Sequence, residues 1–226
     1  MAEFTIYLGN KNYSSWSLRG WLMLKATGVA FDEVVIPLYE PQSRAEILRH
    51  TPSGKMPTLV HERKTGGPVT VWESLAIGEY LAELFPQAGL WPQDPAARAH
   101  ARAISSEMHA GFLPLRRHFP MNMRSVFDRE IIPEAQGDID RIAALWRDCR
   151  QRYGHSSEHG GGDFLFGSFT IADAMFAPVV SRFRTFKLPL DGEVEAYARA
   201  ISAWPAYQEW LAGARNEPMI IEQWEF

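Results

Sequence analysis

The chain has 226 residues, of which 46% are hydrophobic and 22% are charged, a composition that excludes a disordered or fibrous protein. Lys and Arg number 23 against 27 Asp and Glu, and the net charge of −4 provides no basic field for nucleic acid or for an anionic membrane. The single cysteine, Cys149, excludes an internal disulfide, a CxxC redox pair and a thiolate-based zinc site.

We expect a cytoplasmic protein. The first residues do not combine a basic segment with an apolar one, so they do not read as a secretory signal. No apolar run approaches the roughly 18 residues needed to cross a membrane. A reducing compartment also fits a chain with one cysteine.

The first third of the chain alternates strand and helix patterns. Short β-rich runs predict strands, and the helical runs place apolar residues on one face. A Gly-containing turn at 64–67 predicts a hairpin between the last two strands. In chain order the patterns predict strand 4–8, helix 16–27, strand 31–38, a weak helix at 41–49, strands 58–61 and 69–72, and helix 75–84.

The proline-rich segment 85–95 is the best candidate for a domain boundary, because strand patterns end there. We therefore predict an α/β domain at 1–84, of order βαβαββα with a mixed sheet, a linker at 85–95 and an all-α domain at 96–226. A loop rich in Gly and Ser covers 155–163. The helices expected in the second domain are 96–119, 133–153, 170–186, 193–204 and 206–214.

Pro57 stands in a loop directly before a predicted strand. A cis Met56–Pro57 bond would turn the chain tightly and leave the backbone of Met56 free to pair with an extended peptide. Spacing alone favours an ordinary turn proline, so the residues leave both interpretations open.

Thr170 and Asp173 have the spacing of a helix capping box. The pattern predicts the start of a buried helix at this point. We therefore assign Asp173 a role in folding rather than in acid catalysis.

These features together resemble the cytosolic glutathione transferase superfamily. The resemblance extends over the whole chain. It implies a thioredoxin-like domain followed by a helical domain, glutathione as co-substrate, and a homodimer. It is carried by the βαβαββα opening and, in order, by Lys55-Met56-Pro57, Glu73-Ser74 and Thr170-x-x-Asp173.

The segment Ser14-Ser15-Trp16-Ser17-Leu18-Arg19 is similar to the serine-type members of that superfamily. It is nearest to the Ser-Ser-Cys-x-x-Arg segment of the zeta class, which includes maleylacetoacetate isomerase. Trp16 replaces the cysteine of that class, which argues against isomerase activity and against the disulfide chemistry of cysteine-type members. The pattern implies that Ser14, or alternatively Ser15, meets the glutathione thiol, and that Arg19 forms a structural ion pair.

A serine hydroxyl can hold a thiol as thiolate without a general base. Lowering a thiol pKa from about 8.5 by ~2 units needs ~2.7 kcal/mol of preference for the anion. A hydrogen bond to a charged group provides roughly 1.5–3 kcal/mol, and a helix N-terminus adds ~0.3–1 kcal/mol. Helix capping is the structural alternative for these serines, and one serine can cap while another meets the thiol.

The resemblance also assigns the rest of the tripeptide. The backbone of Met56, ahead of cis-Pro57, should pair with the cysteinyl unit. Ser74 should bind the γ-glutamyl carboxylate at a helix N-terminus, and Glu73 should bind its ammonium group. Two candidates for the glycyl carboxylate follow from position, Gln42 and Lys55.

A second pocket should lie between the domains and take a hydrophobic electrophile. The residues expected to border it share one helical face, although interdomain packing explains that spacing equally well: Met108, His109, Phe112 and Arg116. His155 and His159 have the spacing of a metal pair but lie in a loop without an evident third ligand, so we predict no metal site.

We therefore expect a glutathione transferase whose thiolate attacks a small hydrophobic electrophile. Two alternatives remain: glutathione-dependent cis–trans isomerisation, and a non-catalytic module that binds glutathione or another protein. The presence of Ser14, Pro57, Glu73 and Ser74 favours an enzyme over a binding module.

Overall fold

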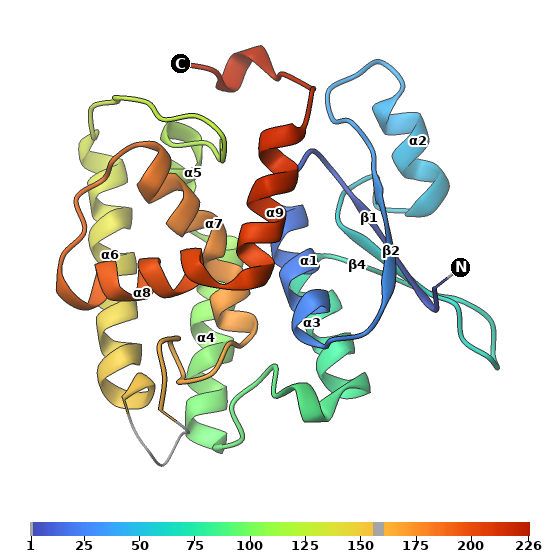
Figure 1. The fold of residues 1–226 in the computed structure, drawn as a ribbon, viewed down its shortest axis with the longest axis horizontal. Coiled ribbons are helices and arrows are strands. Elements are labelled where there is room, and N and C mark those ends of the chain that lie inside the picture. The colour runs from blue at the N-terminus through green and yellow to red at the C-terminus, as the bar shows by residue number, and fades with distance from the viewer. Residues whose placement is uncertain (1, 156–160) are drawn as a thin grey trace.

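The computed structural model describes residues 2–155 and 161–226 of the chain (Figure 1). In this part of the chain, strands alternate with helices first and helices alone follow. The elements are β1 (Phe4–Leu8), α1 (Ser15–Ala26), β2 (Phe31–Val35), α2 (Ser43–His50), β3 (Thr58–His61), β4 (Val69–Trp72), α3 (Ser74–Leu84), η1 (Pro86–Ala88), α4 (Pro95–Ala110), α5 (Leu113–His118), α6 (Pro133–Cys149), the π-helical turn η2 (Arg150–Gly154), α7 (Ile171–Thr185), α8 (Gly192–Ala203), α9 (Pro205–Asn216) and η4 (Glu222–Trp224).

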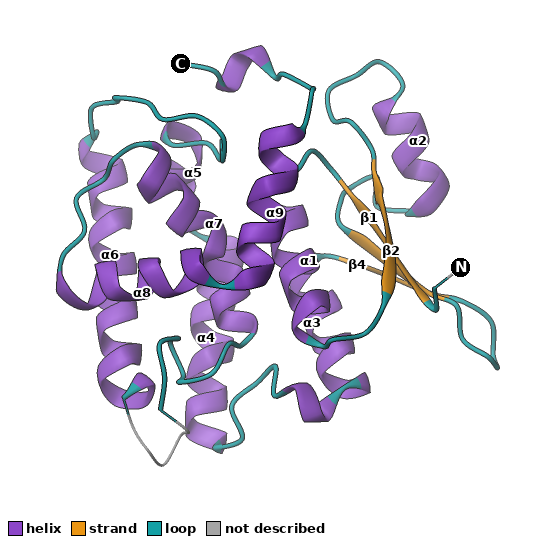
Figure 2. Ribbon diagram, viewed as in Figure 1, coloured by secondary structure: helices purple, strands orange, loops and turns teal. Residues whose placement is uncertain are grey.

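The strands form one mixed sheet in the order β2-β1-β3-β4. β1 runs parallel to β2 and antiparallel to β3, and β4 pairs antiparallel with β3. Helices α1 and α3 lie on the side of the sheet that faces the remaining helices, and α2 lies on the other side (Figure 2). A mixed sheet with its helices, followed by a helical domain, confirms the predicted fold class.

Helix α7 is the centre of the helical domain. All its side chains from Ile171 to Phe183 are buried, as expected for a helix that is apolar around most of its circumference. It packs against α1 and α4. The Asp173 carboxylate accepts hydrogen bonds from the backbone N–H groups of Leu165 (3.1 Å) and Thr170 (2.8 Å), which confirms its predicted role in folding.

The predicted helix 96–119 is wrong as a single element. Helix α4 ends at Ala110, and α5 begins at Leu113. Phe112 between them has a left-handed backbone, with φ of 61°. Pro114 explains the break, because a proline removes a backbone donor and its ring clashes with the carbonyl four residues earlier, here that of Ala110.

The predicted strand 31–38 is too long, since β2 ends at Val35. Pro37 follows shortly after and cannot donate to a sheet ladder. β2 is an edge strand, and three of its five residues are exposed, which keeps it short.

The last ten residues return to the N-terminal domain, a contact that the sequence analysis did not foresee. The Trp224 ring lies 5.6 Å from the Tyr13 ring and 5.1 Å from the Tyr39 ring, measured between centroids. Glu225 accepts hydrogen bonds from the Tyr13 hydroxyl and the Arg124 guanidinium. The C-terminal segment therefore covers the turn that leads into α1.

Across the described residues, we find no helix with both the length and the apolar character that a membrane crossing requires.

Candidate functional site

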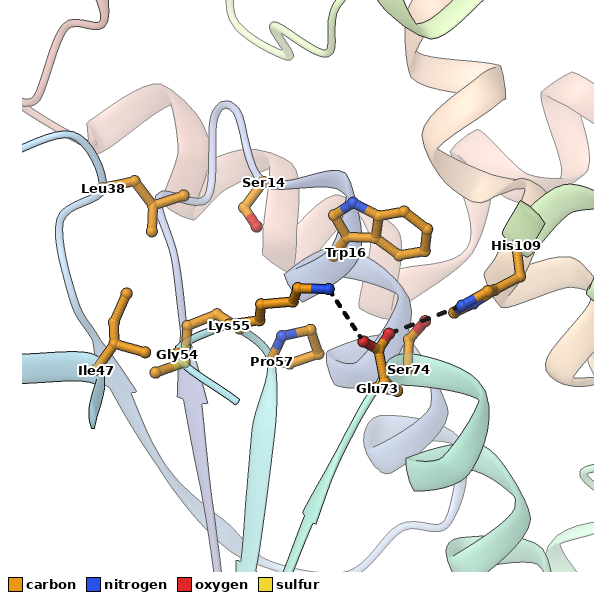
Figure 3. Close-up of a pocket in the computed structure, with 11 residues that line it drawn as sticks. Ser14, Trp16, Leu38, Ile47, Gly54, Lys55, Pro57, Glu73, Ser74 and His109 are labelled. Atoms are coloured by element: carbon orange, nitrogen blue, oxygen red, sulfur yellow. Dashed lines mark ion pairs between the residues drawn. The ribbon is translucent and has the colours of Figure 1, made fainter. Parts of the chain in front are cut away.

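A cavity of about 440 Å³ lies where α1, the loop before β3 and the start of α3 meet (Figure 3). It draws residues from both domains, since His109 of α4 closes one side. The lining residues are Ser14, Trp16, Leu38, Ile47, Gly54, Lys55, Met56, Pro57, Glu73, Ser74 and His109.

Ser14 caps helix α1 and borders this cavity. Its Oγ accepts a hydrogen bond from the backbone N–H of Ser17 (3.3 Å) and lies 2.8 Å from the Ser17 Oγ. Ser14 has non-helical backbone angles, which direct its side chain across the first turn of the helix. The hydroxyl therefore combines two properties at one point, a helix N-terminus and access to a cavity.

Ser15 is oriented differently. It lines a neighbouring cavity of about 560 Å³ and is absent from the lining of the first. Trp16 borders both cavities and thus forms part of the wall between them. Of the two predicted serines, Ser14 shares a cavity with Met56, Glu73 and Ser74, and Ser15 does not.

Pro57 and Gly20 bring α1 against the loop before β3. The Met56–Pro57 peptide bond is cis, as the resemblance implied and as spacing alone did not favour. A Cβ on Gly20 would lie 2.9 Å from the Pro57 ring, so the absence of a side chain at Gly20 permits this close packing. The backbone amide and carbonyl of Met56 have no hydrogen-bond partner among the described residues, which leaves both groups available to a ligand.

Glu73 precedes α3 with an unusual backbone conformation, φ of 69° and ψ of 125°. A non-glycine residue in this region carries strain, which is often found at functional sites. Its carboxylate lies 3.8 Å from the Lys55 Nζ and 3.7 Å from the His109 Nε2 (Figure 3). Burial lowers the pKa of His109. The Glu73 carboxylate raises that pKa, whereas the nearby Arg19 and Arg116 guanidiniums lower it further.

Ser74, next in the chain, is buried and donates to the sulfur of Met175 at 3.9 Å.

The second cavity is bordered by aromatic rings and guanidinium groups. It lies between the start of α1, the α5 region and the C-terminal segment. Its lining residues are Tyr13, Ser15, Trp16, Leu38, Tyr39, Leu113, Arg116, Arg117, Pro120, Met121, Arg182 and Trp224.

Arg19, Arg116 and Arg182 form a group of guanidiniums without a salt-bridge partner in the described ranges 2–155 and 161–226. The Nε atom of each donates to a backbone carbonyl, respectively that of Met175, Gly111 and Phe119. Arg19 and Arg182 are almost completely buried. Burial lowers the pKa of Arg116 to about 10 and that of Arg182 to about 9.

Arg19 does not form the ion pair that we predicted. Burial lowers its pKa well below the usual value, and both its terminal nitrogens are buried without a hydrogen-bond partner in the described part of the chain. Its guanidinium carbon lies 4.4 Å from the centroid of the Trp16 ring. Among the described residues, Arg19 therefore makes a cation–π contact with Trp16 in place of a salt bridge with a carboxylate.

The structure separates the residues predicted for the two sites. The first cavity contains Lys55, Met56, Pro57, Glu73 and Ser74, as expected, and also His109, which we had assigned to the electrophile pocket. Arg116 borders the second cavity. Three predicted residues border neither: Gln42 is exposed at the start of α2, Met108 is buried in the core, and Phe112 is buried at the break before α5.

Sequence reasoning missed Arg182 and Trp224. Arg182 could have been noticed, because it interrupts a long apolar stretch of α7. Trp224 carried no such signal, because only the fold brings the end of the chain to the second cavity.

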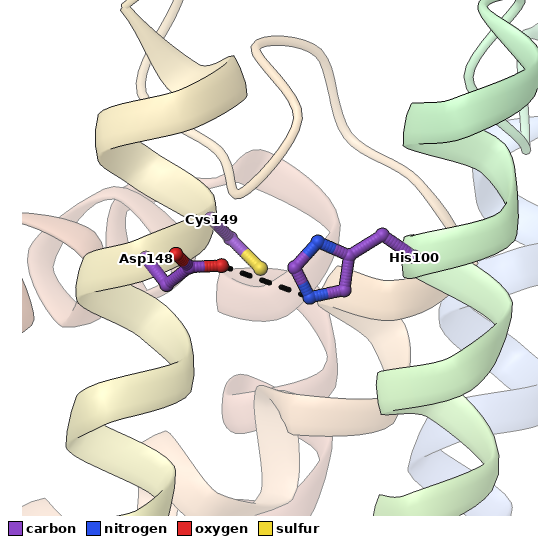
Figure 4. Close-up of side chains that lie close together, drawn as sticks. All are labelled: His100, Asp148 and Cys149. Carbon is purple, nitrogen blue, oxygen red and sulfur yellow. Dashed lines mark ion pairs between the residues drawn. The ribbon is translucent and has the colours of Figure 1, made fainter.

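His100, Asp148 and Cys149 lie close together at the end of α6 (Figure 4). Asp148 pairs with Arg152 (3.2 Å), and the Tyr153 hydroxyl lies 3.3 Å from His100 Nδ1. Burial raises the pKa of the Cys149 thiol to about 12. Asp148 and His100 are thus already engaged by protein groups.

Of the two histidines with metal-pair spacing, His155 is described and lies 3.1 Å from Glu193. His159 lies outside the described residues.

Two family models match the chain. The family described as "Glutathione S-transferase, N-terminal domain" matches residues 13–84, and "Glutathione S-transferase, C-terminal domain" matches residues 129–213. Together they cover α1 to α3 with strands β2 to β4, and then α6 to most of α9.

Among curated proteins, the chain is 30% identical to a probable maleylacetoacetate isomerase of Caenorhabditis elegans, over 78% of this chain and 77% of that protein. It is also 30% identical to the maleylacetoacetate isomerase of Rattus norvegicus, over 90% of this chain and 89% of that protein. These are similarities along most of both chains.

The chain is also similar to solved structures of glutathione transferases. A glutathione transferase homologue from Burkholderia with bound glutathione is 25% identical, with a TM-score of 0.66 over 94% of this chain and 98% of that one. A theta-class glutathione S-transferase from Xanthomonas axonopodis pv. citri, also with glutathione bound, is 25% identical, with a TM-score of 0.64 over 96% of this chain and all of that one.

Proposed function

Because the chain belongs to the glutathione S-transferase family, we propose that it is a glutathione transferase that holds the glutathione thiol as thiolate beside Ser14. One observation carries the proposal. The Ser14 hydroxyl, at the N-terminus of α1, opens into the same cavity as the unpaired backbone of Met56 and the strained Glu73.

The first cavity offers a complementary group for most of the charged and polar parts of glutathione. The amide and carbonyl of Met56 would pair with the cysteinyl backbone in the manner of an added strand. The Glu73 carboxylate would bind the γ-glutamyl ammonium, and the N-terminus of α3 at Ser74 would bind the adjacent carboxylate. Lys55, whose side chain is 74% exposed, can reach the glycyl carboxylate.

Ser14 would act as a hydrogen-bond donor and not as a nucleophile. A hydrogen bond to an anion and the dipole of the twelve-residue α1 together provide roughly 2–4 kcal/mol. This is enough to lower the thiol pKa by ~2 units. No side chain needs to remove the proton, because at neutral pH the bound thiol then loses it to water.

The second cavity, which Ser15 also lines, would hold the electrophile, with Trp16 at the border between the two sites. Tyr13, Tyr39 and Trp224 provide aromatic surface for an apolar substrate. Attack joins the glutathione sulfur to the electrophilic carbon, and the leaving group departs with the electron pair of its bond.

A second candidate function, glutathione-dependent cis–trans isomerisation, is favoured by Arg116 and Arg182. Neither has a carboxylate salt-bridge partner among the described residues, so each could bind a carboxylate of the substrate. In this reaction the thiolate adds to a carbon–carbon double bond, the resulting single bond rotates, and elimination restores the thiolate. Relatives at 30% identity carry the name maleylacetoacetate isomerase.

Two measurements test the proposal. Ultraviolet titration of the glutathione complex should give a thiol pKa about two units below that of free glutathione. Turnover should then be measured with neutral electrophiles, carboxylate-bearing electrophiles and a cis-alkene diacid. Retention on immobilised glutathione with no turnover of any substrate would favour a binding module and contradict both enzymatic functions.

A further inference from the structure

Ser17 lies directly beneath Ser14 and is completely buried. Its Oγ accepts a hydrogen bond from the backbone N–H of Gly9 (2.8 Å), at the end of β1. The Ser14 hydroxyl donates to the same Oγ at 2.8 Å. The two hydroxyls thus form a chain that runs from the end of the sheet to the first cavity.

The Ser17 proton has no acceptor in this arrangement. The Ser17 Oγ acts as acceptor in both of its hydrogen bonds, from the Gly9 N–H and from the Ser14 hydroxyl. Within the described parts of the chain, its own O–H has no acceptor. Burial excludes bulk water as a partner. A buried donor without an acceptor is costly. A change in the orientation of the two hydroxyl protons that gives the Ser17 O–H an acceptor is therefore favourable when an anion binds.

We propose that Ser17 is a positioning residue that supports Ser14 as a donor to the bound thiolate, an inference that rests on the proposed function. When an anionic sulfur occupies the first cavity, the Ser14 proton turns toward it. The Ser17 proton then turns toward the vacated lone pair of the Ser14 Oγ. The resulting relay runs from the Gly9 N–H to Ser17, from Ser17 to Ser14, and from Ser14 to sulfur.

This reversal needs rotation of two hydroxyl protons and no movement of heavier atoms. Hydroxyl protons rotate freely to suit their partners. In the reversed state the Ser14 Oγ accepts from both the N–H and the Oγ–H of Ser17 while it donates to sulfur. Hydrogen bonds in such a chain polarise one another, which strengthens the last bond in the direction of the anion.

The inference is tested by the pKa of enzyme-bound glutathione in Ser17→Ala. We expect that pKa to rise by about 0.5–1 unit, while the Kd for glutathione stays within about threefold. Turnover at a pH below the bound thiol pKa should fall by about 3- to 10-fold and recover at higher pH. A purely structural role for Ser17 would change stability without this alkaline shift of the pH profile.

Two further variants keep the test decisive. Ser17→Cys preserves the shape of the side chain but donates weakly, so it should raise the pKa in the same direction even if Ser17→Ala fails to fold. Ser202→Ala is the matched control, because Ser202 is a buried serine of α8 whose hydroxyl donates only to the Ala198 carbonyl. It should leave the bound thiol pKa unchanged.

The possible failures can be told apart. If the wild-type protein does not lower the thiol pKa, the proposed function itself is overturned. If it does, and Ser14→Ala removes the effect while both Ser17 variants keep the wild-type value, only the relay is overturned.

Discussion

The Arg116 guanidinium carbon lies 4.9 Å from the centroid of the Trp16 ring. This contact joins the start of α1 to α5 and thus links the two domains at the wall between the cavities. A cation on an aromatic face is stabilised by about 0.5–2 kcal/mol. The wall therefore depends on both domains keeping their relative position.

Ser14→Ala should reduce turnover at neutral pH by at least ~10-fold and leave the glutathione Kd within a few-fold of wild type. The variant loses the donor to the thiolate but none of the groups that bind the rest of the tripeptide. Steady-state kinetics and a glutathione titration measure the two effects. Ser15→Ala is the control, and a larger loss in that variant would move the assignment to Ser15.

Ser14→Ala should also lower stability, because the side chain caps α1. We expect a loss of about 0.5–2 kcal/mol in the free energy of unfolding. Kinetics should therefore be compared well below the melting temperature of the variant, determined by circular dichroism.

Glu73→Gln should weaken glutathione binding about 10-fold or more, because a hydrogen bond between charged groups is worth roughly 1.5–3 kcal/mol. The kcat at saturating glutathione should change little, since Glu73 is proposed to bind an ammonium group far from the sulfur. Glu79→Gln, in the helix that follows Glu73, is the control, as its carboxylate pairs with Arg102 at the surface. Equal effects of the two variants would contradict the assignment.

Arg116→Met should distinguish the two candidate functions. If the second cavity binds a carboxylate, kcat/KM for a carboxylate-bearing electrophile should fall about 10-fold or more, and that for a neutral analogue should stay within about threefold. Paired kinetics on the two substrates provide an internal control. An equal fall with both substrates would indicate lost packing on Trp16 instead of lost recognition.

Asp173 predicts a pH dependence of stability. Burial is the dominant cause that raises its pKa to about 6, from an ordinary 3.8. Between these values the folded chain binds the proton more tightly than the unfolded chain. The contribution of this group to the free energy of unfolding is therefore greatest below about pH 4 and falls as the pH rises to about 6.

Asp173→Asn removes this titration. Urea unfolding of both proteins across that pH window should show a difference between them that depends on pH. A constant difference would show that Asp173 has the same pKa in the folded and unfolded chain.

The family resemblance, and not local patterns alone, predicted the residues of the first cavity. Ser14 and Glu73 each stand at the start of a helix that hydrophobic spacing predicts, but local rules explain both as residues of a helix start. The break at Phe112 could also have been predicted from the sequence, because Pro114 destabilises a regular helix when it lies in the helix interior.

The second cavity could not be predicted in this way. It joins Tyr13 to Arg182 and Trp224, which are far apart along the chain and meet only through tertiary packing. Helical spacing alone also does not show which residues of a helix are buried in the core and which border a cavity. Met108 and His109 are neighbours in sequence, yet one is buried in the core and the other borders a cavity.

The return of the C-terminal segment onto Tyr13 has a practical consequence for recombinant work. A purification tag fused after Phe226 would begin close to Trp224, which lines the cavity proposed for the second substrate. The chain enters the sheet through the inner strand β1, whose N-terminal end lies away from the C-terminus (Figure 1). An N-terminal fusion is therefore the better choice for kinetic measurements, and a loss of activity specific to C-terminal fusions would be an artefact of crowding.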